Sequence, residues 1–169
     1  NDGNIIVVGG FVRAGGGAAC IAACGIAKWN VSSSGWQAVA SGLRGIITSD
    51  DPNVQGVAVN TNGDYWVTGT FRAAGLTTNT ACRVARYSQS ASAWQSVGGS
   101  GLSTLTNSGN GGRAIALSSD GTAHIGFDVA GGGLGPTTNY YTSNGTSLTP
   151  AASIPDTIYS TLAVKNIVY

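Results

Sequence analysis

The chain has 169 residues and a formal net charge of +1, with 9% charged residues and 27 glycines, and its acidic residues are all aspartate. This near-neutral balance excludes the broad positive field that holds a nucleic acid. In addition, no apolar run approaches the roughly 20 residues that cross a bilayer as a helix. Glutamate and lysine, which favour helices, are scarce, and Gly, Ser, Thr and Asn abound, so we expect an all-β protein.

The sequence divides into three similar units, which span residues 1–60, 61–118 and 119–169. Each unit opens with a turn dipeptide: Asp2-Gly3, Asn62-Gly63 and Asp120-Gly121. Asn-Gly and Asp-Gly between apolar runs favour a two-residue type I′ turn, in which both central residues have positive φ. We therefore expect each unit to begin inside a β-hairpin.

A strand follows each turn and ends on a repeated phenylalanine: IIVVGGF to Phe11, YWVTGTF to Phe71 and AHIGF to Phe127. After a glycine-alanine loop comes a second strand, GIAKWNV, RVARYSQ or NYYTSN, which carries Trp29, Tyr87 and Tyr141 in matching places. Seven residues later each unit has another large apolar residue: Trp36, Trp94 and Leu148. The segments GVAVN, RAIALS and STLAV then lead into the next turn. The pattern predicts four short strands per unit, which we call a to d, with a the strand before the turn.

Four short strands joined by turns, with a period near 58 residues, are typical of a β-propeller blade. The run from Gly-Gly-x-Phe through Ile-Ala-Lys-Trp-Asn to Trp-Gln-x-Val resembles the glycine-rich β-propeller repeats of bacterial and phage surface proteins, and more distantly kelch repeats. The resemblance implies three blades, of which the first lacks its first strand and the third is divergent, followed by the start of a further blade. Three blades do not close a ring, so it also implies a larger or oligomeric assembly.

In a blade of this kind the a-b and c-d connections lie at one end and the b-c and d-a connections at the other. The second pair is long in this sequence, and long loops on a rigid scaffold are where recognition usually occurs. This long-loop end is expected to carry most of the arginines, an aspartate pair and the cysteines: Arg13, Arg44, Asp50, Asp51, Arg72, Arg83, Arg113, Cys20, Cys24 and Cys82. We predict a partner-binding face in which arginines anchor carboxylates or sugars. The alternative is that these arginines are solvated or tie loops together.

The three cysteines are Cys20, Cys24 and Cys82. The CIAAC segment has no second cysteine pair and the chain has a single histidine, which falls short of the four ligands of a structural zinc site. The remaining interpretations are one disulfide among the three, or small buried side chains. We expect no metal and no cofactor.

Catalytic groups are scarce in the sequence. His124 is the single histidine and lies in a predicted strand, where a structural role is the simpler interpretation. Asp50 and Asp51 are sequence neighbours, whereas the carboxylates of a glycosidase face each other across a cleft. The sequence therefore predicts that the chain is not an enzyme.

The sequence favours a non-enzymatic structural or binding module of a surface-exposed extracellular or virion protein, such as a fibre, adhesin or filament subunit. Its partners would be other protein subunits, copies of itself among them, or surface glycans, without nucleic acid or membrane insertion. The alternative is a fragment of a secreted propeller enzyme or lectin that acts on glycans, with catalytic residues outside this segment. An intracellular kelch-like scaffold is disfavoured, because such a domain would carry more Lys and Glu.

Overall fold

The fold is that of a computed structural model, which describes residues 3–16, 21–45, 51–75, 81–98, 111–127 and 140–151. In these segments the regular structure consists of strands, and no helix is present. The prediction of an all-β protein is therefore confirmed for the described part of the chain.

The strands form three antiparallel sheets and two short ribbons. Sheet 1 has the order β1 (Ile5–Val8), β4 (Ile26–Asn30), β5 (Gly35–Ala38). Sheet 2 has the order β7 (Asn53–Val59), β8 (Tyr65–Thr70), β10 (Val84–Ser88), β11 (Ala93–Ser96). Sheet 3 has the order β12 (Gly112–Leu117), β13 (Ala123–Phe127), β14 (Tyr140–Ser143), β15 (Leu148–Pro150). One ribbon pairs β2 (Arg13–Ala14) with β3 (Ile21–Ala22), and the other pairs β6 (Leu43–Arg44) with β9 (Ala73–Ala74).

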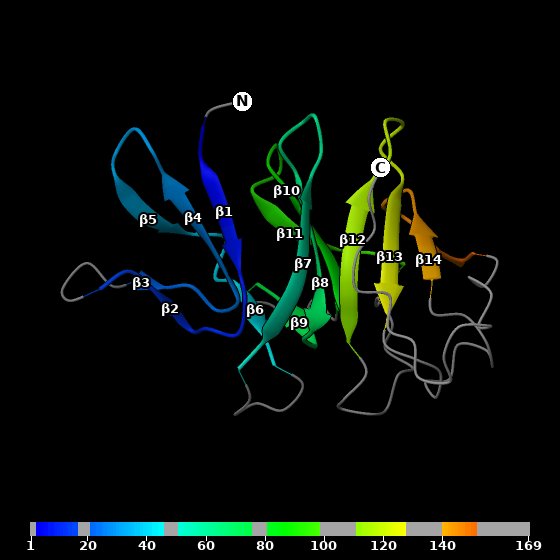
Figure 1. The fold of residues 1–169 in the computed structure, drawn as a ribbon, viewed down its shortest axis with the longest axis horizontal. Coiled ribbons are helices and arrows are strands. Elements are labelled where there is room, and N and C mark those ends of the chain that lie inside the picture. Colours follow the sequence, from blue (N-terminus) through cyan, green and yellow to red (C-terminus); the bar gives the residue numbers. More distant parts are fainter. Residues whose placement is uncertain are drawn as a thin grey trace.

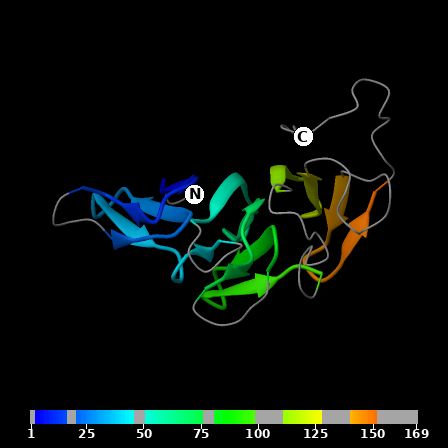
Figure 2. The same cartoon turned by 90° about the horizontal axis from the view of Figure 1, so that it is seen from below.

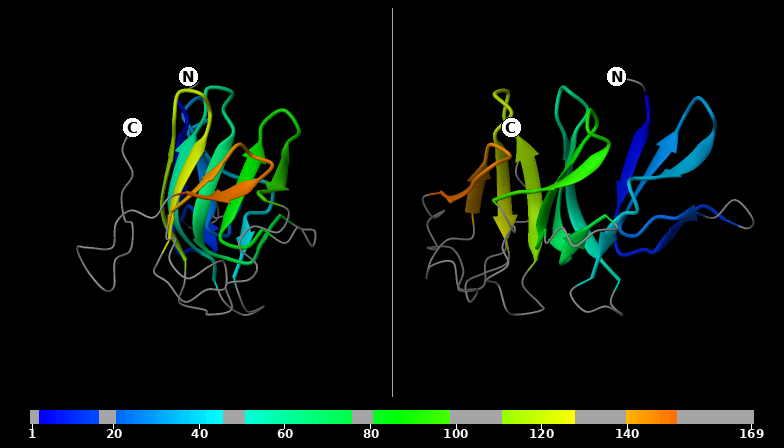
Figure 3. Two further views of the ribbon diagram at one scale, coloured as in Figure 1. Left: turned by 90° about the vertical axis from the view of Figure 1, so that its right-hand side faces the viewer. Right: turned by 180° about the vertical axis from the view of Figure 1, so that it is seen from behind.

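The three sheets stand side by side, with the short turns at one end of the molecule and the two ribbons toward the other (Figures 1 and 3). Seen along the strands, the sheets fan out, and β7 of sheet 2 contacts both β1 and β12 of the neighbouring sheets (Figure 2). Sheets 2 and 3 each take their first strand from the end of the preceding sequence unit, because β7 lies within residues 1–60 and β12 within 61–118.

The hairpin turns differ from the prediction. Gly63 has φ +82° and Gly121 has φ +84°, but neither Asn62 nor Asp120 has positive φ, so these are not type I′ turns. Gly63 N donates to Asn60 O at 3.0 Å, and Asn60 N to Asp64 O at 3.1 Å, which closes a three-residue loop of a type I turn followed by a left-handed glycine. Asn60 stabilises this type of turn, because its side-chain Oδ1 accepts hydrogen bonds from both Asn62 N at 2.9 Å and Asp64 N at 2.8 Å.

Each pair of neighbouring sheets shares a hydrophobic core. We call the face of a sheet that meets the preceding sheet its leading face, and the opposite face its trailing face. The leading face of sheet 2 carries Tyr65, Val67 and Trp94, which pack with Ile26 and Val39 on the trailing face of sheet 1. The next core repeats this arrangement one sheet further along, with Trp66, Val84, Val97, Ile115, Ile125, Phe127 and Tyr141. Burial of these apolar side chains between sheets is the main stabilising term.

The register of sheet 3 corrects one predicted equivalence. Tyr87 lies opposite Tyr65 in sheet 2, but the residue in the corresponding place of sheet 3 is Ser143, opposite Ala123. Tyr141 lies opposite Ile125 instead, and its ring meets Phe127 edge-on at 5.4 Å. The strand AHIGF is two residues shorter than its counterparts, so the aromatic residue moves along the sheet to fill the same core.

Candidate functional site

The predicted site residues are spread over several elements of the long-loop end. Arg13 on β2, Arg44 on β6 and Arg72 just before β9 are exposed, and so is Asp51 before β7. Arg83, just before β10, is buried with 3% exposure, and Arg113 on β12 is half-buried. Asp50 lies outside the described residues.

The β6–β9 ribbon joins two sequence units at this end. Arg44 lies opposite Ala73 in the ribbon, and Arg72 N donates to Arg44 O at 2.9 Å. Gly75 N donates to Gly42 O at 2.8 Å on the other side of the ribbon. Two arginines that are far apart in the sequence are therefore held at adjacent backbone positions by hydrogen bonds between units.

Arg83 lies directly behind this ribbon. Its backbone N donates to Phe71 O at 3.0 Å, and Ala81 N donates to Arg72 O at 3.1 Å, so the segments on either side of the b-c loop are paired at its base. Arg83 adopts a left-handed φ of +67°, and its carbonyl accepts Thr68 Oγ1 at 2.8 Å and Gly69 N at 3.1 Å. Burial lowers the pKa of the guanidinium, and negative charge on the neighbouring Cys82 sulfur would oppose this.

Cys82 is buried beneath the same arginines. Its Sγ lies 3.6 Å from Arg72 O. Burial raises the pKa of the Cys82 thiol above its ordinary value, and the positive charges of Arg83 and Arg72 oppose that rise. Since the raised pKa keeps the thiol neutral, Cys82 is suited to packing rather than to nucleophilic chemistry or metal ligation.

The described cysteines are not joined by a disulfide. Cys24 and Cys82 both carry free thiols, and Cys24 Sγ lies 4.0 Å from Val12 O in the first unit. Cys20 lies outside the described residues, so pairing through Cys20 stays a prediction. In the described part of the chain, no group of three or more His, Cys, Asp or Glu side chains gathers in a way that could hold a metal ion.

Arg113 belongs to the seam between sheets 2 and 3. Its Nη1 donates to Gln55 Oε1 at 2.6 Å. The register of β7 shifts between Val54 and Gly56, and that of β12 shifts between Gly112 and Ala114. Gln55 and Arg113 are therefore the extra residues of two equivalent β-bulges. The hydrogen bond links neighbouring sheets, as the alternative of structural arginines expects.

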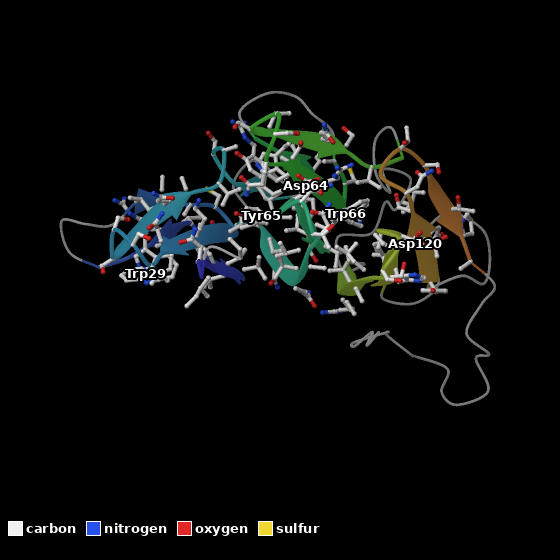
Figure 4. All side chains as sticks on the ribbon, turned by 90° about the horizontal axis from the view of Figure 1, so that it is seen from above. Trp29, Asp64, Tyr65, Trp66 and Asp120 are labelled. Carbon is white, nitrogen blue, oxygen red and sulfur yellow. The ribbon has the colours of Figure 1, made fainter. Side chains whose placement is uncertain are left out.

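A second charged cluster, which the sequence did not predict, lies at the opposite, short-turn end, around Asp64 and Trp66 (Figure 4). Asp64 Oδ2 accepts from Arg86 Nη2 at 2.5 Å, from Arg86 Nε at 3.2 Å and from Asn60 Nδ2 at 3.2 Å. Asp64 Oδ1 accepts from Gln89 N at 2.9 Å. Burial by itself raises the pKa of Asp64, but the hydrogen bonds from Arg86, Gln89 and Asn60 outweigh it and hold the pKa below its usual value.

This second cluster is structural. The Asp64 side chain is 5% exposed, and the Arg86 guanidinium lies 5.8 Å from the centroid of the Trp66 ring. A Cβ added to Gly145 of sheet 3 would stand 2.9 Å from Arg86 Nη1, so the pair is packed against the next sheet. The signal in the sequence was the acidic residue directly after the Asn62-Gly63 turn, a position that Asn4 and Thr122 hold in the other units.

His124 lies on the trailing face of sheet 3. It is half-buried, and its ring stacks on that of Tyr140 with centroids 5.9 Å apart, while Nδ1 and the Tyr140 hydroxyl share a hydrogen bond. Burial lowers the pKa of His124, and the charge of Asp120 opposes this.

Comparison with known proteins gives a likeness of fold alone. No model of a known protein family matches the chain, and no curated protein matches it at a significant level. A solved structure of the extracellular domain of a putative hybrid two-component system from B. thetaiotaomicron is similar to it, with a TM-score of 0.52 and 15% sequence identity. The match covers 88% of this chain and 17% of that one. In the described part of this chain, no helix has the length and apolar character needed to cross a membrane.

Proposed function

We propose that the chain is a non-enzymatic binding and structural module of a surface-exposed extracellular or virion protein, built from β-propeller blades. The blade arrangement is supported by the repeated meander of sheets 2 and 3 and by the contacts of β7 with β1 and β12. The extracellular setting is supported by the solved extracellular domain that the chain resembles in fold.

The long-loop end is the recognition surface of this module, and its ligand carries carboxylates, as acidic glycans and acidic protein segments do. The observation that carries this proposal is the β6–β9 ribbon, which holds the exposed Arg44 and Arg72 at adjacent backbone positions. Arginine presents a planar set of donors that matches a carboxylate in a bidentate manner. A ribbon clamped by hydrogen bonds between two units presents such side chains with little loss of backbone entropy on binding.

The distribution of charged residues between the two ends supports this assignment. Of the described acidic residues, Asp64 and Asp120 are in the turns of the short-turn end, and Asp51 alone is at the long-loop end. Arg83 adds positive charge behind the ribbon. Among the described residues of this end, arginines outnumber aspartates, which favours the approach of an anionic ligand.

The test compares binding of acidic and neutral glycans and of acidic peptides to the protein and to three variants. We expect acidic ligands to bind, and Arg44→Gln or Arg72→Gln to weaken binding about tenfold or more, since a hydrogen bond to a charged group contributes about 1.5 to 3 kcal/mol. Lys28→Gln, which removes a charge from β4 of sheet 1, serves as the matched control and should leave affinity unchanged. Equal binding of neutral and acidic ligands, or equal loss in the Lys28 variant, would refute the assignment.

A further inference from the structure

The leading face of sheet 1 is apolar and only partly covered. Ala27 and Trp36 pack with residues of the β2–β3 ribbon, whereas the part that carries Ile5 and Val7 is exposed. Ile5 is 55% exposed and Val7 is 37% exposed. Their equivalents on the leading face of sheet 2, Tyr65 and Val67, are 6% and 0% exposed, because sheet 1 covers them. Figure 4 shows the same difference, with Trp29 at the margin of the molecule and Tyr65 between the first two sheets.

Two aromatic side chains complete this face. Trp29 lies opposite Ile5 in the sheet, and Trp36 lies opposite Trp29, with the two rings edge to face at 5.3 Å. Both are half-buried. Adjacent apolar side chains that are exposed on one face of a sheet are typical of a contact site.

The internal repeat specifies what covers such a face. Trp94 of sheet 2 donates its Nε1 to Val39 O of sheet 1 at 3.4 Å. The residue at the same place in sheet 3, Leu148, lies against Gly98, directly after Val97, so close that a Cβ on Gly98 would stand 2.8 Å from Leu148 Cβ. In both cases the large residue of strand d rests on the segment that ends strand d of the preceding sheet. Trp36 is the third member of this series.

The other half of the contact is present in the same chain. Val39 follows β5 and Val97 follows β11, and the residue that follows β15 in the same way is Ala151. Ala151 is half-buried, and its N donates to Tyr140 O at 3.1 Å. Within the segments that the structure describes, no sheet follows sheet 3 to cover Ala151, His124 and Tyr140 on its trailing face.

We propose that the leading face of sheet 1 docks against the trailing face of sheet 3 of a second copy of this chain. Identical chains then associate head to tail, and in each new contact Trp36 meets the segment after β15 as Trp94 and Leu148 meet the corresponding segments within the chain. A head-to-tail contact closes into a ring if the rotation between copies allows it, and otherwise extends into a filament. This surface is distinct from the Arg44 and Arg72 ribbon, so the inference does not depend on the proposed ligand.

The experiment measures molar mass by light scattering and sedimentation over a wide range of protein concentration. The expected result for the wild type is a mass that rises with concentration, with a blue shift of tryptophan emission as Trp36 becomes buried. A wild type that stays monomeric throughout overturns the proposal. If the tryptophan emission of such a monomer changes on addition of a neutral oligosaccharide, the proposal is also overturned, because the leading face would then be a sugar-binding surface.

Two charged variants test the geometry. Val7→Asp blocks the leading face and Ala151→Glu blocks the trailing face, so each alone should be monomeric, whereas their equimolar mixture should form a dimer and nothing larger. Val59→Asp, at a residue 52% exposed on β7, is the matched control and should associate like the wild type. Continued association of Val7→Asp, or loss of association in Val59→Asp, contradicts the proposal. If circular dichroism shows that Val7→Asp is unfolded, Ile5→Asp takes its place, because Ile5 is the more exposed of the two.

Discussion

Arg113 Nη1 donates a hydrogen bond to Gln55 Oε1 at 2.6 Å, across 58 positions of the sequence. The two residues are the extra residues of equivalent bulges in β12 and β7, so the repeat bonds to itself at this point. The sequence separation of this contact therefore equals the repeat period, because equivalent positions of neighbouring sheets bond to each other.

A double-mutant cycle measures this contact. We expect Arg113→Ala and Gln55→Ala to be coupled by about 1 kcal/mol in the free energy of unfolding, the usual net contribution of such a hydrogen bond. Denaturant unfolding of the wild type, the two single variants and the double variant gives the coupling. Additive single effects would mean that the side chains do not interact in solution.

Asp64→Asn should be among the more damaging polar substitutions in the described part of the chain. It leaves Arg86, whose side chain is 27% exposed, without its carboxylate, and we expect a loss of about 1 to 3 kcal/mol in the free energy of unfolding. Denaturant unfolding at neutral pH measures it. Asp120→Asn is the control, because Asp120 lies in the equivalent turn of the third unit but is exposed, and its effect should be much smaller. Equal effects would contradict the anchoring role of Asp64.

Acid should remove the same stabilisation. The pKa of Asp64 is lowered in the folded protein, so the folded state keeps this carboxylate ionised to lower pH than the unfolded chain does. Its contribution is complete above about pH 4, the ordinary aspartate value, and is lost as the pH falls below it.

The difference in unfolding free energy between the wild type and Asp64→Asn, followed on acidification, isolates this group. Asp120, whose pKa is lowered to about 2, is present in both proteins and cancels. We expect the difference to be constant near neutral pH and to shrink below about pH 4. A difference that grows on acidification would show that the pKa of Asp64 is raised.

Gly112→Ala tests the close approach of sheet 3 to sheet 2. A Cβ at Gly112 would overlap Thr68 Oγ1 and stand 2.8 Å from Thr68 Cβ, and Thr68 is fixed by its bond to Arg83 O. We expect a loss of about 2 kcal/mol or more from overpacking, read from the thermal and denaturant midpoints. Gly16→Ala is the matched control, since nothing lies within 4 Å of a Cβ there, and it should be near neutral. Similar stability of the two variants would mean that the sheets are further apart than described.

The sequence predicted the strands well, because alternation and turn residues act locally. The strands that carry Tyr65, Tyr87 and Trp94 lie where the repeat places them, and Leu148 lies on strand d of sheet 3 as expected. The predicted type I′ turns were wrong because short polar side chains bond the loop backbone, Asn60 in the second unit and Asp120 in the third.

The candidate site was harder to predict. Arg44 and Arg72 meet through the β6–β9 ribbon, whose two-residue strands come from different units and have no periodic signal of their own. The Asp64–Arg86 pair was missed for a related reason, because its partners lie 22 positions apart and meet only when β8 pairs with β10. Pairing between units is visible only once the sheets are stacked.

The most direct test of the central claim, that the long-loop end recognises anionic ligands, is a map of amide chemical-shift changes as an acidic oligosaccharide is titrated into the protein. We expect the changes to cluster on the β6–β9 ribbon, at Arg44, Arg72 and Ala73, and to be absent from the Arg72→Gln variant. Changes confined to the short-turn end around Asp64, or no changes at saturating ligand, would contradict it.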